Sequence, residues 1–74
     1  MNITDFEYLK EALAVDLAEM LAKDYSLSVD EALNTLYNSD TYAKLSAPET
    51  GLYFQSSLYV YSILKEELTS GKLK

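Results

Sequence analysis

Carboxylates are the side chains of this sequence that could do chemistry. There are 12 aspartates and glutamates, and on a helix Glu7 would lie beside Glu11 and Asp16 beside Glu19. Such pairs bind a divalent cation, or act as general acid and base, only when a pocket and further ligands surround them. We expect both pairs to lie on a solvated helix face, with Glu19 paired to Lys23 at i, i+4. The sequence therefore predicts no metal site, no cofactor and no catalytic residue.

The residue types that are missing narrow the function further. Without cysteine or histidine there are no disulfides, no thiolate nucleophile and no zinc site built from those residues. Without arginine there is no bidentate donor for phosphate or guanine, and a net charge of −6 would repel a polyanion. The sequence thus predicts a protein that is not an enzyme and does not bind nucleic acid directly.

One segment, residues 14–37, has the helix, turn and capped-helix spacing of DNA-binding helix pairs. Lys23 is its only basic residue among several acidic ones, which excludes contact with DNA phosphates. The reverse idea stays open, because an acidic segment of this kind could mimic nucleic acid and occupy the basic groove of another protein.

The first two helices are marked by their starting residues. A hydroxyl followed three residues later by Glu forms a capping box, and this pattern occurs at Thr4 and again at Ser28. The first helix is expected at 5–25, because no Gly or Pro interrupts it and strong helix formers fill it. The second is expected at 28–38.

The rest of the chain predicts one short and one long helical segment. We expect a helical turn at 41–45 capped near Ser39, a loop packed on the core at 46–54, and a last helix at 57–70 that stops at Gly71. One run of apolar residues at 52–54 has no strand partner elsewhere. The fold class is therefore all-α, a small bundle of three main helices plus one short helical turn, in a single domain over 1–74.

The first helix has two apolar faces. An edge of alanines adjoins its main stripe, so the helix is expected to pack on two sides. It is either a central helix flanked by the other helices of its own domain, or its alanine edge admits a helix from a second copy or a partner. The main stripe comprises Phe6, Leu9, Leu13, Leu17, Met20 and Leu21, and the alanine edge comprises Ala14, Ala18 and Ala22.

The last helix divides into an inward stripe and an outward pair. Tyr59 and Ile63 lie four residues apart on the side opposite the stripe, where we expect them to be exposed. The inward stripe comprises Phe54, Leu58, Val60, Tyr61, Leu64 and Leu68.

Tyrosine is the residue type in excess, with seven copies. A tyrosine buries a large ring while its hydroxyl stays at water, which suits both the rim of a small core and a protein interface. The rings either roof a core too small to bury them, or a cluster around Tyr53, Tyr59 and Ile63 forms a docking patch for a partner.

Two features bear on location. The longest unbroken apolar run, residues 58–61, is far too short to span a bilayer. Asp5 and Glu7 place negative charge where a secretory signal peptide carries positive charge. The sequence therefore predicts a cytoplasmic protein without a membrane span.

One string of residues over 28–68 includes Ser28-x-x-Glu31-Ala32-Leu33, Leu36-Tyr37-x-Ser39, and Thr50-Gly51-Leu52-Tyr53-x-Gln55-Ser56. This string resembles a family of short uncharacterised bacterial helical proteins, of the kind found near toxin-antitoxin-like genes. The resemblance implies a binding partner encoded nearby, and it brings no catalytic residues.

These features together predict a small acidic module that acts by protein–protein contact, either with a partner or by self-association as a homodimer. The alternative is an antitoxin-like inhibitor whose negative charge covers a basic site on a partner protein. The residues expected to bind the partner are Tyr53, Tyr59, Ile63, Ala14, Ala18 and Ala22.

Overall fold

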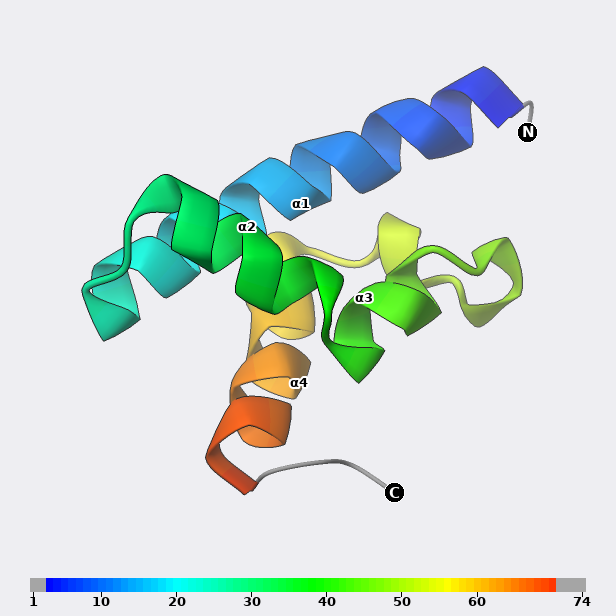
Figure 1. Cartoon of the computed structure of the whole chain (residues 1–74). Helices are drawn as coiled ribbons and strands as arrows, with labels where there is room; N and C mark the ends of the chain where they lie inside the picture. The colour runs from blue at the N-terminus through cyan, green and yellow to red at the C-terminus, as the bar shows by residue number, and fades with distance from the viewer. Residues whose placement is uncertain (1–2, 71–74) are drawn as a thin grey trace.

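The computed structural model describes residues 3–70, in which every regular element is helical (Figure 1). The elements are α1 (Ile3–Tyr25), α2 (Val29–Tyr37), α3 (Asp40–Leu45), the 3₁₀ turns η1 (Pro48–Thr50) and η2 (Leu52–Phe54), and α4 (Ser57–Ser70). The predicted all-α bundle is confirmed, and the predicted helix ranges agree with the observed ones to within two residues. The predicted stop at Gly71 lies outside the described residues.

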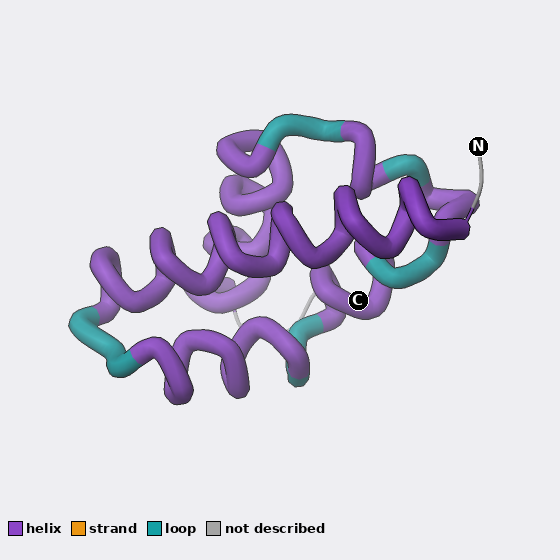
Figure 2. Tube along the Cα trace, turned by 90° about the horizontal axis from the view of Figure 1, so that it is seen from above, coloured by secondary structure: helices purple, strands orange, loops and turns teal. Residues whose placement is uncertain are grey.

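The helices pack around the second half of α1. Figure 2 shows α1 and α2 lying side by side and joined by a short link, and Figure 1 shows α4 running steeply away from them. α1 contacts α2, α4 and η2, while α3 packs on α4. No helix within 3–70 has the length and apolar character needed to cross a membrane. α1 is the central helix, on which α2, α4 and η2 converge.

The core is built mostly from leucines on helix faces that the sequence pattern identifies. Leu17 and Leu21 of α1 are fully buried together with Leu36 of α2 and Leu64 of α4. Burying a leucine side chain contributes about 2 kcal/mol, so these residues supply much of the stability of a domain this small. The remaining members of the core are Leu13, Ala14, Ala18, Ala32, Leu45, Leu52, Val60 and Tyr61.

Local capping signals place three of the helix starts. The capping box at Ser28 is present, because Ser28 Oγ accepts from Glu31 N at 3.1 Å and Glu31 Oε1 accepts from Ser28 N at 3.0 Å. Ser39 Oγ accepts from Tyr42 N at 3.0 Å and so caps α3. Ser56 Oγ accepts from Tyr59 N at 3.2 Å at the start of α4. Each hydroxyl satisfies an amide that the helix itself leaves without a partner.

The capping box predicted at Thr4 is wrong. The helix already includes Ile3, so the backbone of Thr4 lies inside α1 and not at its N-cap. Phe6 is buried and packs its ring on Tyr53 in an edge contact, with 4.9 Å between centroids. This tertiary contact holds the first turn on the body of the protein.

The segment expected to be a loop forms the two 3₁₀ turns. Gly51 joins them with φ = +72°, a left-handed conformation that glycine adopts without steric strain. Leu52 is buried in the core as expected, whereas Phe54 points to solvent. The turns therefore reverse the chain and bring η2 against α1.

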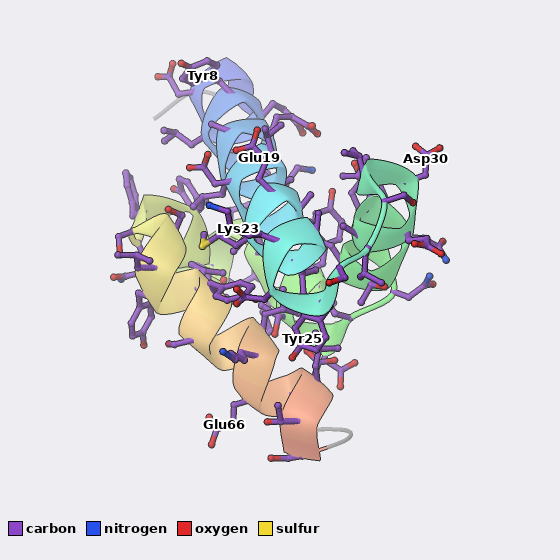
Figure 3. The ribbon with its side chains drawn as sticks, turned by 90° about the vertical axis from the view of Figure 1, so that its left-hand side faces the viewer. Tyr8, Glu19, Lys23, Tyr25, Asp30 and Glu66 are labelled. Atoms are coloured by element: carbon purple, nitrogen blue, oxygen red, sulfur yellow. The ribbon has the colours of Figure 1, made fainter. Side chains whose placement is uncertain are left out.

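The predicted inward stripe of the last helix is wrong only at its start, and Leu68 near its end packs against the core as predicted. Val60, Tyr61 and Leu64 are buried, but Phe54 and Leu58 are exposed, which corrects their predicted placement in the core. The physical reason for the exposure of Leu58 is the position of the start of α4: Figure 3 shows it on the opposite side of α1 from α2, so α2 does not cover it.

Candidate docking surface at the start of α4

Three large apolar side chains are exposed within six residues of chain where η2 leads into α4. Phe54 is 66% exposed, Leu58 is 74% exposed and Tyr59 is 52% exposed. We call these three residues the hydrophobic cluster. Single exposed apolar residues are ordinary on a protein surface, whereas three so near one another along the chain make this segment a candidate site of contact.

Aromatic packing fixes one end of the hydrophobic cluster. The ring of Phe54 stacks on Tyr53 with 4.4 Å between centroids, and Tyr53 in turn meets the buried ring of Phe6 edge-on. Lys10 Nζ lies 5.5 Å from the centroid of the Phe6 ring and 3.6 Å from Glu7 Oε1. The exposed Phe54 ring is therefore held in place by a row of contacts that ends on α1.

A groove between α1 and α4 adjoins the cluster. It has a volume of about 500 Å³ and is lined by Asp16, Glu19, Met20, Lys23, Ser57 and Leu58. Figure 3 shows Glu19 and Lys23 on the face of α1 that borders this groove, with α4 beside them. We call this the α1–α4 groove. It combines apolar side chains with two carboxylates and one ammonium.

The three residues predicted to form a docking patch differ in exposure. Tyr59 is exposed as expected, and Tyr53 is half-buried under Phe54. Ile63 is half-buried and packs against the core, so its predicted exposure is wrong. A helical wheel places Ile63 opposite the inward stripe of α4, but the elements packed on α4 cover a wider face of this helix than that stripe.

The alanine edge of α1 does not form an open face. Ala14 and Ala18 are buried in the core of the same chain, and Ala22 is partly buried against it. This corrects their assignment as partner-binding residues and leaves the first reading, a central helix flanked by its own domain. Their burial shows that the alanines serve packing within the domain, where small side chains let helices approach closely.

Glu67 is a buried carboxylate that sequence reasoning did not single out. It is 4% exposed, and its Oε1 accepts from Thr41 N at 3.0 Å and from Thr41 Oγ1 at 2.8 Å. Its Oε2 accepts from Asp40 N at 2.8 Å. Glu67 thus caps the start of α3 from another helix. Its position three residues after the buried Leu64 is the one signal that could have indicated burial.

Tyr61 forms a second polar contact, which joins a buried ring to an exposed carboxylate at the edge of the core. Its hydroxyl donates to Asp24 Oδ2 at 2.7 Å, and Lys65 Nζ lies 3.8 Å from the same oxygen. Burial, and next the hydrogen bond to the Asp24 carboxylate, raise the pKa of Tyr61 well above the ordinary value of tyrosine. This contact ties the middle of α4 to the end of α1 and leaves the hydroxyl protonated.

The acidic pairs considered from the sequence are not joined by further metal ligands in the part of the chain that the structure describes. Within residues 3–70 no group of three or more carboxylates is placed to hold a metal ion. Glu7 is paired with Lys10, and the expected ion pair of Glu19 with Lys23 is not formed among the described side chains. The carboxylate of Glu19 therefore remains at the edge of the α1–α4 groove.

Comparison of the chain with protein-family models, with curated proteins and with solved structures gives no match.

Proposed function

We propose that the protein is a non-catalytic interaction module that binds another protein through the hydrophobic cluster. The observation that carries this proposal is the exposure of Phe54, Leu58 and Tyr59 at the start of α4 beside an open groove. Covering a leucine or an aromatic ring of this kind contributes about 2 kcal/mol, and aromatic residues concentrate at the centres of protein interfaces. The cytoplasmic location predicted from the sequence is part of this proposal.

Net charge favours a different protein over a second copy as the occupant. Two copies of a chain with charge −6 repel each other at low ionic strength, and salt screens that repulsion. A homodimer should therefore strengthen as salt is added, whereas a complex with a basic partner should weaken. The resemblance to short bacterial proteins implies a partner encoded near this chain, which would be such a different protein.

The second candidate function is the antitoxin-like inhibitor that covers a basic site on its partner. Exposed carboxylates such as Asp16 and Glu19 beside the groove favour it, because they add charge to an apolar contact. The two functions differ in effect. An inhibitor suppresses an activity of the captured protein, and a simple binding module leaves that activity unchanged.

The test is affinity capture from the native host with matched variants. The double variant Leu58→Gln/Tyr59→Gln should lose a stoichiometric partner that the wild-type chain retains. The control Tyr8→Gln/Val29→Gln removes comparable apolar area from positions that are exposed elsewhere on α1 and α2, and it should retain the partner. Capture that is equal for both double variants would contradict the proposal.

Sedimentation of the purified chain at low and high salt tests self-association separately. We expect a monomer in both conditions. A dimer that strengthens with salt and is lost in Leu58→Gln/Tyr59→Gln would show that a second copy is the occupant.

A further inference from the structure

We propose that the α1–α4 groove receives an amphipathic helix of a partner, with apolar residues on one face and basic residues beside it. This inference rests on the proposed function and specifies the chemistry of the occupant. It follows from three properties of the groove: its position between two helices, its apolar residues, and the sign of its charge.

The shape of the groove favours a helix. Peptides that bind in extended form usually add to the edge of a sheet, and residues 3–70 contain no strand to offer one. A channel between two helices presents ridges and grooves at the spacing that a third helix can fill. Figure 3 shows the start of α4 beside the middle of α1, and the groove is lined by residues of both helices.

The apolar part of the occupant is set by Leu58 and Met20. Leu58 is largely exposed and Met20 is partly exposed, and both line the groove from opposite helices. Methionine is unbranched and adapts to differently shaped side chains, which suits a surface that receives an apolar helix face. Leucine-like residues at i, i+3, i+4 and i+7 of the partner would cover these two side chains.

The basic part of the occupant is set by Asp16 and Glu19. Both side chains are exposed at the groove, and Glu19 forms no ion pair with Lys23. The groove carries two carboxylates against the single ammonium of Lys23, within a chain whose net charge is −6. Lysine or arginine at the edge of the partner's apolar face would therefore be attracted, and an acidic helix would be repelled.

Fluorescence anisotropy with a synthetic peptide tests this proposal. The probe is a labelled peptide of about 18 residues, made of leucine and lysine with the leucines on one helical face. A second peptide has the same composition in an order that destroys the apolar face. The full-length chain should bind the first peptide at least about tenfold more tightly than the second. Circular dichroism should show a gain of helix on binding.

Variants of the chain locate the site. Leu58→Gln should weaken binding of the first peptide by about tenfold, because it removes one buried leucine from the complex. Asp16→Asn/Glu19→Gln should weaken it by about fivefold and reduce its dependence on salt. The matched control Asp30→Asn/Glu66→Gln removes the same charge from exposed positions outside the groove (Figure 3) and should change binding by less than about twofold.

Three results would overturn the proposal: equal binding of both peptides, equal effects of the two charge variants, or unchanged binding by Leu58→Gln. Each would show general attraction between a cationic peptide and an acidic chain. No binding of either peptide would overturn it as well. If the host partner were nevertheless lost from Leu58→Gln/Tyr59→Gln in affinity capture, the proposed function would stand and only the helical, basic occupant would be wrong.

Discussion

The two ends of α4 reverse the usual distribution of polar and apolar side chains. Near its end a glutamate is 4% exposed, and at its start a leucine is 74% exposed. Glu67 is stable inside because three donors from Asp40 and Thr41 converge on its oxygens. Nothing in the described chain covers Leu58 to the same degree. Internal hydrogen bonds explain the buried carboxylate, whereas contact with another molecule is the explanation we propose for the exposed leucine.

The largest effect expected from this comparison comes from two leucines on the same helix. Leu64→Ala should lower the free energy of unfolding by about 3 kcal/mol, because Leu64 is fully buried and its removal leaves a cavity. Leu58→Ala makes the same chemical change at an exposed position and should alter it by less than about 0.5 kcal/mol. Urea unfolding monitored by circular dichroism measures both. Similar losses for the two variants would break the comparison.

The next effect concerns two neighbouring glutamates. Glu67→Ala should cost about 2 kcal/mol, since it leaves buried donors of Asp40 and Thr41 without their acceptor. Glu66→Ala, one residue earlier and exposed, should change the free energy of unfolding by less than about 0.5 kcal/mol. Urea unfolding of the two variants at neutral pH is the measurement. A small loss for Glu67→Ala would mean that water replaces the carboxylate without penalty.

A smaller effect is expected in the middle of the helix. Tyr61→Phe should cost about 1 kcal/mol at neutral pH through loss of the hydrogen bond to Asp24. Because the native pKa of Tyr61 is raised, the unfolded chain loses this proton first as the pH passes 10.0, and native stability falls. Urea unfolding across pH 8 to 11 should therefore show a decline of up to about 1 kcal/mol above pH 10 that is absent in Tyr61→Phe. An identical decline in both chains would contradict this assignment.

The smallest effect is expected at the hydrophobic cluster itself. Phe54→Ala should cost only about 0.5 kcal/mol, because the ring is mostly exposed and its main internal contact is the stacking on Tyr53. Thermal unfolding should show a shift of a few degrees at most. A loss comparable with that of Leu64→Ala would mean that Phe54 supports the fold and is not free to bind a partner.

Most features that depend on local sequence were predictable, the capping box at Thr4 being the exception, and those that depend on distant packing were not. The caps at Ser28 and Ser39 need only a hydroxyl and the next turn of chain, so the sequence contains all of their determinants. The exposure of Leu58 depends on the angle at which α4 crosses α1, which a helical wheel does not contain. The burial of Glu67 depends on donors 26 and 27 residues away.

The residues of the candidate site show the same difference between local and long-range determinants. Tyr59 was predicted as exposed from its position opposite the apolar stripe, and the structure confirms it. The alanines of α1 were equally consistent with an internal or an external helix neighbour, because small side chains permit either. Leu58 was wrongly assigned to a core stripe, since an amphipathic pattern identifies apolar residues without showing how far the neighbouring helices extend. Met20 packs against the core as predicted, and the sequence did not show that it also lines the groove.

The cap that Glu67 provides for α3 also links the opening of α3 to the undocking of α4. α3 has six residues, too few for a helix to persist alone in water. Its first amides point to a carboxylate on α4, so they stay protected only while that helix is docked. In deuterium labelling of the native protein, the amides of α3 and of the second half of α4 should therefore exchange together, as one cooperative unit.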